Sequence, residues 1–317
     1  MLGYKAFKKG LICDPTGNNP FQFAENTVFE TDEAANPCHS GFHFCKYPLD
    51  VLDYYPLIDA DGNTTEFAEV EALDEAVTDD NKKWCTKKLK VGARLSLGEF
   101  VKAFVNLTIE KTITKNSKSK ANQNGEAVIS SKGYSAKIGS SGNYAKIGSS
   151  GYSAKIGSSG YSAQIGSSGD YAKIGSSGYS AQIGSSGYSA KIGSSGDSAK
   201  IGSSGYSAQI GSSGDSAQIG SSGNYAKIGS SGNYAKIGSS GDSAKIDSTG
   251  EDSVICCAGN NSMVRAKKGS WITLSEWRWS DEKQRSVPVC VKTVLVDGET
   301  VKADTWYRLE GGELKEV

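Results

Sequence analysis

Two groups of residues in this chain have side chains that could do chemistry. The first is a cluster in which Cys38, His43 and Cys45 lie close together in the sequence. Zinc prefers thiolate and imidazole ligands, usually four in a tetrahedron, so Cys13 or Cys85 would have to complete the set. The alternative is a buried histidine among buried reduced thiols, since free cysteine behaves as a small hydrophobe. We favour this alternative because the chain contains no Cys-x-x-Cys pair.

The second group is a ladder of lysines and tyrosines carried by a nine-residue repeat. Of thirteen regular units such as YSAKIGSSG, nine have Lys before Ile and four have Gln. Lys beside Tyr is typical of surfaces that bind anionic or aromatic ligands, for instance nucleotides. The candidate ligand-binding residues are Lys137, Lys146, Lys155, Tyr134 and Tyr144. The alternative, which we favour, is that these side chains solvate the repeat, with Lys blocking aggregation.

The repeat itself predicts a β-solenoid. Isoleucine recurs at every ninth residue from Ile138 to Ile246, and the frame extends to Ile129 and Val264, giving sixteen units. Ala and Ile lie two residues apart and so face one side of a strand, while Lys or Gln faces the other. The GSSG that follows supplies small residues and positive-φ positions for a tight corner. Two units per coil is the preferred closure and three per coil the alternative. Eight coils would form a rod of about 40 Å.

Two familiar functions of such solenoids do not fit this repeat. A calcium-binding nonapeptide needs an aspartate in every unit, whereas aspartate opens only four of the regular units. Ice binding would favour flat threonine ladders, and the outward position holds Lys or Gln. We therefore expect no metal and no cofactor on the solenoid.

The segments around the repeat divide the chain into four parts. We expect an N-terminal α+β domain over 1–114, with a short helix beginning at Pro48, and a polar linker over 115–124. The solenoid spans 125–268, and a small β cap over 269–317 contains an Asp-Gly hairpin at 297–298. The apolar segment 95–114 should form a helix or strand pair packed on the first coil. The predicted fold class is mainly β.

Composition limits the partners. Thirty-five basic residues balance thirty-five acidic ones, so no general affinity for nucleic acid or anionic membrane is indicated. No apolar stretch approaches the roughly 20 residues of a membrane span. The amino-terminal residues lack the features of a secretory signal, so we expect a cytoplasmic protein. Seven scattered cysteines argue against a disulfide framework.

The segment GFHFCKYPLDVLDYY, residues 41–55, resembles the signature of an uncharacterised family of phage, prophage and gut-bacterial proteins. In that family a domain of this kind often precedes Gly-Ser-Ala-Ile repeats and a short Trp-containing tail. The resemblance implies a phage or bacterial origin, with host cytoplasm or virion as the location. It implies no activity.

The same segment is similar to the central element of ADP-ribosyltransferase-like folds, in which a Phe-containing strand and a following tyrosine shape a nicotinamide pocket. The resemblance implies a catalytic carboxylate at Glu69 or Glu71 in EFAEVEA. It also implies a cleft lined by Gly41, Phe42, Phe44 and Tyr54 or Tyr55.

The function expected from these observations is structural. A non-enzymatic protein would use the solenoid as a rigid spacer or display surface and the N-terminal domain to bind a protein partner, as a monomer or a homo-oligomer. Two alternatives stay open. The N-terminal domain would transfer ADP-ribose, or the solenoid would bind a small anionic ligand along its Lys and Tyr ladder.

Overall fold

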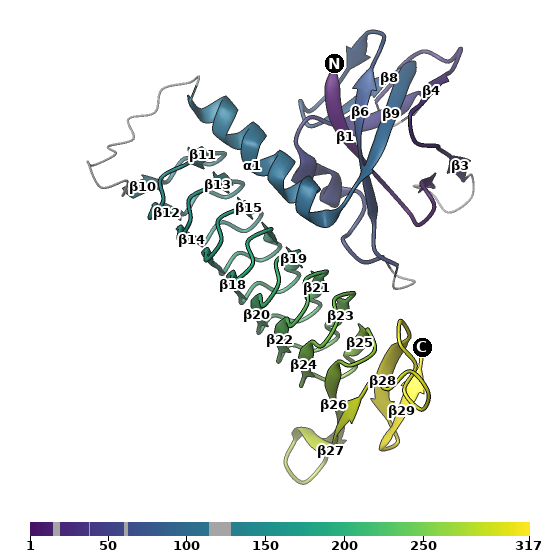
Figure 1. Ribbon diagram of the computed structural model, residues 1–317, viewed down its shortest axis with the longest axis vertical. Coiled ribbons are helices and arrows are strands. Elements are labelled where there is room, and N and C mark those ends of the chain that lie inside the picture. The colour runs from purple at the N-terminus through teal and green to yellow at the C-terminus, as the bar shows by residue number, and fades with distance from the viewer. Residues whose placement is uncertain (15–19, 38, 60–62, 114–127) are drawn as a thin grey trace.

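The structure, a computed structural model, describes residues 1–14, 20–37, 39–59, 63–113 and 128–317. An N-terminal sheet is followed by one long helix, a two-sheet β-solenoid and two C-terminal hairpins (Figure 1). The predicted mainly-β fold class is confirmed. The predicted linker, 115–124, lies outside the described residues. No helix in the described part of the chain is long and apolar enough to cross a bilayer.

The N-terminal sheet has seven antiparallel strands in the order β4-β9-β6-β1-β5-β8-β7. Its strands are β1 Leu2–Phe7, β4 Thr27–Glu30, β5 Phe42–Cys45, β6 Glu66–Ala72, β7 Ala76–Val77, β8 Lys83–Thr86 and β9 Lys88–Leu95. A small hairpin joins β2 Ile12–Cys13 to β3 Phe21–Gln22. One side of the sheet holds a core that includes Phe7, Phe23 and Phe42. The other side packs on the two helical segments.

The helical segments are the 3-10 helix η1 Pro48–Asp53, with Pro at its first turn, and the α-helix α1 Leu97–Ile113. Helix α1 begins with a capping box, because the Ser96 backbone N–H donates to Glu99 Oε2 (2.8 Å) and the Glu99 N–H donates back to Ser96 Oγ (3.3 Å). Phe100 of α1 is fully buried and stacks on Phe67 of β6, with ring centroids 3.9 Å apart. This contact joins the helix to the N-terminal sheet.

The solenoid consists of two parallel sheets whose strands alternate along the chain. Each strand pairs in register with the strand 18 residues later, as Ile129 does with Ile147. Two units per coil is therefore confirmed, and three per coil is excluded. We name the two sheets the open sheet and the covered sheet. The open sheet contains β10 Val128–Ser131, β12 Lys146–Ser149, β14 Gln164–Ser167, β16 Gln182–Ser185, β18 Lys200–Ser203, β20 Gln218–Ser221, β22 Lys236–Ser239 and β24 Val254–Cys257. The covered sheet contains β11 Lys137–Ser140, β13 Lys155–Ser158, β15 Lys173–Ser176, β17 Lys191–Ser194, β19 Gln209–Ser212, β21 Lys227–Ser230, β23 Lys245–Ser248 and β25 Met263–Ala266.

The solenoid corners differ from the prediction. The glycines of the repeat have no positive φ; the last Gly of each corner is required by close stacking instead. A Cβ on Gly169 would lie 1.9 Å from the carbonyl oxygen of Gly151, one coil earlier. Positive φ occurs at non-glycine positions such as Ser216 and Tyr225, in units that begin with Asp or Asn. There the first side chain accepts a backbone N–H from the next coil, for example Asp215 Oδ1 from Asn233 at 2.7 Å.

The C-terminal region extends both solenoid sheets. β26 Trp271–Ser280 and β27 Arg285–Leu295 continue the open sheet, whereas β28 Trp306–Glu310 and β29 Glu313–Glu316 continue the covered sheet. The hairpin predicted at Asp297-Gly298 is wrong, because the strands on either side of it belong to different sheets. The shorter hairpin turns instead at Gly311 and Gly312, both with positive φ.

Helix α1 does more than the sequence predicted. It packs on the first covered strand, β11, as expected, but it also runs along the solenoid and reaches β13, β15, β17 and β19. Figure 1 shows the helix lying between the N-terminal sheet and the solenoid. The segment before the repeat is thus a lateral cover as well as a contact for the first coil.

Candidate interaction surfaces

The two sheets of the solenoid carry nearly the same strand sequence but face different surroundings. In Lys-Ile-Gly-Ser, the Ile and the Ser are buried inside the coil, and Lys or Gln and Gly point outward. Each sheet therefore presents a ridge of long polar side chains beside a row of glycines. We call these two outward surfaces the covered face and the open face.

On the covered face the glycine row receives helix α1. A Cβ on Gly175 would lie 2.6 Å from the ring of Phe104, and a Cβ on Gly193 would lie 2.6 Å from a methyl group of Val101. Contacts this short require a residue without a side chain. Glycine in these strands lets the helix approach the sheet closely.

The lysine ridge of the covered face binds η1 and its flanks. Asp50 accepts hydrogen bonds from Lys155 Nζ (2.7 Å) and Lys173 Nζ (2.6 Å). Asp53 pairs with Lys173 (2.9 Å) and with Lys191. These carboxylates stand over three consecutive coils, and Asp50 is almost completely buried. They neutralise lysines that the N-terminal domain removes from water.

The same segment continues down the later coils with one contact for each. The Leu57 N–H donates to Gln209 Oε1 (3.0 Å), and Lys227 Nζ donates to the carbonyl oxygen of Ile58 (2.7 Å). Thr64 Oγ1 then donates to Asp247 Oδ2 (2.5 Å). Residues of the N-terminal domain thus contact the ridge of the covered face in order along the solenoid, and in β23 they contact Asp247, which stands in the glycine row.

Burial and charge act in opposite directions in this cluster. Burial alone would raise the pKa of Asp50, but the adjacent Lys173 and Lys155 hold it below its usual range. Burial lowers the pKa of Lys191 to about 8, and the negative charge of Asp50 opposes this shift only in part. The cluster is a structural junction whose charges are occupied within the molecule.

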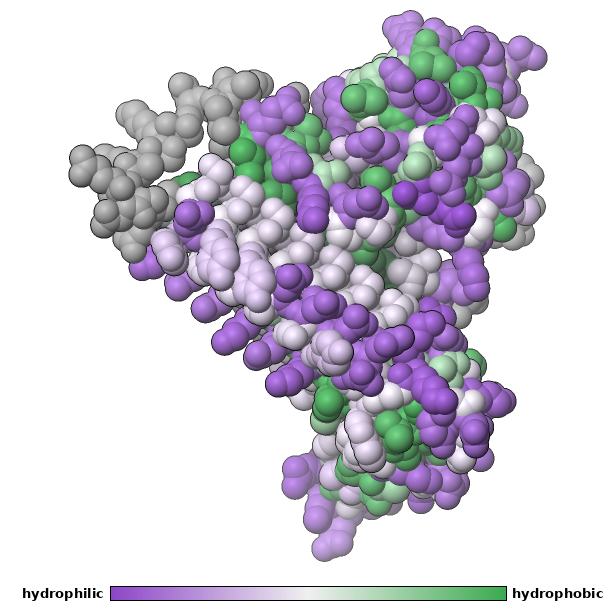
Figure 2. All heavy atoms as spheres, viewed as in Figure 1, coloured by the Kyte–Doolittle hydropathy of each residue, from purple (hydrophilic) through white to green (hydrophobic). Residues whose placement is uncertain are grey.

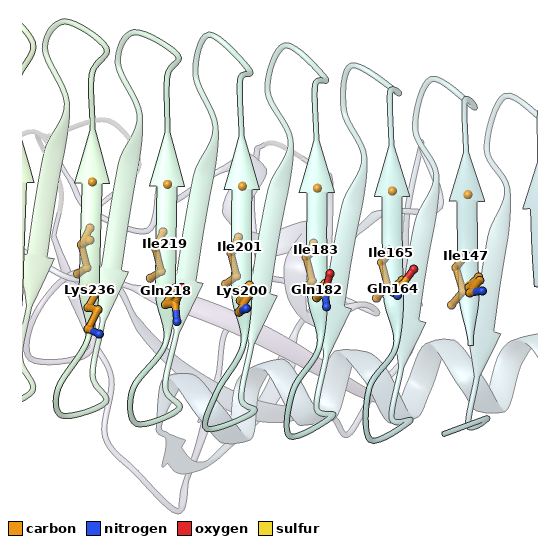
Figure 3. A pocket seen from close by; sticks show the side chains of 18 of the residues that line it. Ile147, Gln164, Ile165, Gln182, Ile183, Lys200, Ile201, Gln218, Ile219 and Lys236 are labelled. Carbon is orange, nitrogen blue, oxygen red and sulfur yellow. The ribbon is translucent and has the colours of Figure 1, made fainter. Parts of the chain in front are cut away.

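The open face has no covering element among the described residues. A Cβ on any of its regular glycines would meet nothing within 4 Å. Its ridge side chains are exposed: Lys146, Gln164, Gln182, Lys200, Gln218 and Lys236. The glycine row beside them is Gly148, Gly166, Gly184, Gly202, Gly220 and Gly238. Together they line a shallow trough along the solenoid (Figure 3).

On the face that Figure 2 shows, the solenoid surface is mostly pale or polar, and hydrophilic side chains project along it. Hydrophobic colour gathers over the N-terminal sheet, near α1 and at the C-terminal hairpins. Tyrosines stack along the edges, with ring centroids 5.0 Å apart for Tyr134 and Tyr152 and 5.4 Å apart for Tyr161 and Tyr179. These rings are solvent-exposed.

The five predicted ligand-binding residues are divided between different surroundings. Lys155 is bound to Asp50 and lies over the Tyr47 ring at 3.9 Å; Lys137 lies 5.1 Å from the same ring. Only Lys146 belongs to the open face. Tyr134 and Tyr144 are exposed. The first members of the ladder therefore do not form one site.

The N-terminal domain contains a pocket where the second resemblance places a cleft. It is lined by Tyr4, Lys5, Ala6, Cys13, His43, Phe44, Cys45, Val51, Tyr54, Tyr55 and Lys83. Burial, together with the positive charges of Lys5 and Lys83, lowers the pKa of His43 to about 4, so the imidazole is neutral at pH 7. Burial raises the pKa of Tyr55, whose hydroxyl lies 3.1 Å from Cys13 Sγ.

The remaining residues named by that resemblance lie outside the pocket. Gly41 and Phe42 do not line it, and Phe42 packs in the core that includes Phe7 and Phe23. Glu69 lies beside the pocket, where its carboxylate accepts a hydrogen bond from the Tyr4 hydroxyl (3.3 Å). Glu71 lies two residues further along β6 and pairs with Leu2. Neither glutamate lines the pocket.

The predicted Cys-His cluster is only partly described. Cys38 lies outside the described residues. His43 and Cys45 share strand β5, and burial raises the pKa of the Cys45 thiol to about 12. Among the residues that the structure describes, no three His, Cys, Asp or Glu side chains are placed to hold a metal ion.

Sequence reasoning missed Asp50, Asp53 and the division of the ridge into two faces. One signal was present. When the regular units are sorted alternately, the covered face has six Lys and one Gln, whereas the open face has three of each. The acidic segment PLDVLD lies opposite the Lys-rich face.

Residues 1–103 match the model of a family described as a domain of unknown function (DUF7666). No curated protein matches the chain, and no solved structure does. The match covers the seven-stranded sheet, η1 and the first part of α1. The N-terminal part of this chain is thus similar to an uncharacterised domain family, and the solenoid lies beyond the match.

Proposed function

We propose that this protein is a non-enzymatic interaction scaffold of phage or bacterial origin. The N-terminal domain would brace one side of a rigid solenoid, and the other side would present a regular surface to a partner. The observation that carries this proposal is the contrast between two nearly identical strand faces. One is occupied along five coils by α1 and is contacted further along by the loop after η1, and the other is open.

The rigidity follows from how the coils stack. Each regular strand after β11 pairs in register with the strands of both neighbouring coils. From β13 to β23, the N–H of the strand's first residue also donates to an alanine carbonyl of the previous coil, as Lys173 N–H does to Ala154 O (2.8 Å). Solenoids gain most of their stability from such interfaces between repeats. A surface whose ridge points repeat about every 4.8 Å is suited to an elongated partner.

The N-terminal pocket supports this proposal better than the transferase alternative. His43 in this pocket is neutral at pH 7, the Cys13 thiol lies within hydrogen-bond distance of the Tyr55 hydroxyl, and the glutamates named by the resemblance do not line the pocket. A transferase would need a carboxylate directed at the bound sugar.

Hydrogen exchange of the full chain, combined with an activity assay, tests the scaffold. We expect slow exchange of the strand amides from β12 to β25 and no nicotinamide release from a nicotinamide dinucleotide. Rapid exchange throughout these strands would overturn the scaffold. So would nicotinamide release that disappears in Glu69→Gln or Glu71→Gln.

A further inference from the structure

The open face has the shape and chemistry of the surface on which α1 rests. Both faces have a glycine row beside a ridge of Lys or Gln, and their strands pair at the same 18-residue interval. The covered face therefore shows what this surface accepts: helix α1 on the glycine row, and carboxylates of the separate segment η1 on the lysines. The open face repeats this surface over the same coils.

Helix α1 matches the solenoid repeat along its length. Ile109 lies against Gly139 and Leu97 lies against Gly211, which are four coils apart. Four coil steps span about 19 Å, and the twelve residues from 97 to 109 rise about 18 Å in an α-helix. Roughly one helical turn therefore meets each coil. A helix with apolar residues three or four apart keeps this register.

No described part of the chain packs against the glycines of the open face. Their Cβ positions are empty of neighbours, and glycine in a strand is less stable than alanine by about 0.5–1 kcal/mol. On the covered face the same glycines make room for a helix. The glycines of the open face would likewise make room for a partner that approaches the sheet closely.

We propose that the open face is a docking surface for an amphipathic α-helix of a partner protein, with an apolar stripe on the glycine row and acidic residues along one edge. This inference rests on the proposed scaffold function and names its partner. The acidic edge follows from Lys146, Lys200 and Lys236, which have no carboxylate partner among the ion pairs of the described residues.

The lysine spacing sets the positions of those acidic residues. Lys146 and Lys200 are three coils apart, or about 14 Å; Lys200 and Lys236 are two coils apart, or about 10 Å. Positions on one edge of a helix recur after about 7 and about 11 residues, which rise about 10 and 16 Å. The partner helix should carry Asp or Glu at these two spacings. The flexible lysine stem takes up the remaining difference.

The area of the open face favours a helix over a second copy of the chain. Eight strands of four residues measure about 38 Å by about 13 Å, or about 500 Å². A stable dimer needs about 800 Å² from each partner, and two copies would bring lysines together without acidic partners. A single helix needs no more than this trough.

The probe is a synthetic peptide of α1, residues 96–110, held helical by a lactam between Lys102 and an Asn106→Asp side chain, both on its exposed side. This peptide and a second one both begin with an added Ser-Ala-Ala, which caps the helix in place of Ser96. The second also carries Ser96→Glu and Leu107→Glu, eleven residues apart along one edge of the apolar stripe. A scrambled peptide of the same composition is the control. Fluorescence anisotropy measures binding of each to the full chain.

We expect both helical peptides to bind, the acidic one more tightly. Gly184→Arg with Gly202→Arg, which places two side chains in the trough, should weaken binding about tenfold or more. Ser186→Arg, at an exposed corner outside the trough, should not. Lys146→Gln with Lys200→Gln should remove the advantage of the acidic peptide.

Three outcomes would overturn the inference. In the first, neither helical peptide binds. In the second, Gly184→Arg with Gly202→Arg leaves the binding unchanged. In the third, sedimentation shows that the chain is a dimer and that the two arginines dissociate it. Hydrogen exchange on the same samples separates this failure from failure of the scaffold. Slow exchange in β12–β25 without peptide binding would reject the helix-docking inference and leave the scaffold function standing. Rapid exchange in these strands would reject both.

Discussion

Asp50→Asn tests whether the buried ion cluster holds the N-terminal domain to the solenoid. The substitution keeps the size of the side chain but leaves Lys155 and Lys173, whose side chains are 17% and 5% exposed, without the carboxylate they share. Removing one partner of a buried pair costs about 3–5 kcal/mol, because the other charge stays buried. Asp53 still contacts Lys173, so we expect about 3 kcal/mol.

Native-state hydrogen exchange is the suitable assay, since a chain of several parts need not unfold in one step. The free energy of opening should fall for amides of η1 and of the covered strands β13 and β15. The folded pKa of Asp50 lies below its ordinary value of 3.8. The stabilisation that the ionised Asp50 carboxylate gives to the folded state is therefore present above pH 3.8 and is lost as the pH falls through the folded pKa. The difference between wild type and variant should shrink in acid.

The control is Glu313→Gln, which breaks the exposed pair with Lys292 and should leave exchange unchanged. Asp50→Asn combined with Lys173→Gln should cost less than the sum of the single changes, because the second removes the unpaired charge. A loss below about 1 kcal/mol for Asp50→Asn would refute the reasoning. It would mean that water reaches the lysines when the carboxylate is absent.

Two further predictions concern the glycine rows and the buried lysines. Gly175→Ala should destabilise the chain by about 1–3 kcal/mol, because the new Cβ would meet Phe104. Gly166→Ala, on the open face, should be neutral or slightly stabilising. Equal melting temperatures for the two variants would contradict the assignment of covered and open faces. The folded pKa of Lys191 is about 8 against an ordinary 10.5, so the unfolded chain binds more protons between these values. The free energy of unfolding should therefore rise with pH across this window, by at most about 3 kcal/mol. Lys191→Met should flatten the rise in denaturant titrations, and an unchanged slope would show that Lys191 is hydrated.

The solenoid could be predicted from the sequence because its physics is local. Ile at every ninth residue, with Ala two residues before it, is sufficient to give the inward face and the coil size. The docking of the N-terminal domain was not predictable in this way, since Asp50 and Asp53 meet lysines more than one hundred residues away. The Lys and Gln pattern carried that information, but only after the units were divided between two sheets.

The errors also have physical causes. The prediction of positive φ at GSSG assumed that glycine is used for its backbone freedom, whereas the corner glycines are needed because the next coil leaves no room for a Cβ. At Asp297 the side chain accepts N–H groups from Glu299 (2.8 Å) and Val301 (3.0 Å), and this local loop directs the chain into the other sheet. In the N-terminal domain, Phe44 and Tyr54 line a pocket, whereas Glu69 and Glu71, which the resemblance named as candidate carboxylates, do not.

The alternation of units between two sheets gives this chain a parity rule. Inserting or deleting one nine-residue unit would transfer every later unit to the opposite sheet, so that β26 and β28 would exchange the sheets they extend. It would also bring residues of the open face, such as Gln182 and Gln218, to positions where the N-terminal domain needs Lys. Changes of eighteen residues preserve both faces. Length variants of this protein should therefore differ by whole coils, and a variant that differs by an odd number of units should lose the contact with its own N-terminal domain.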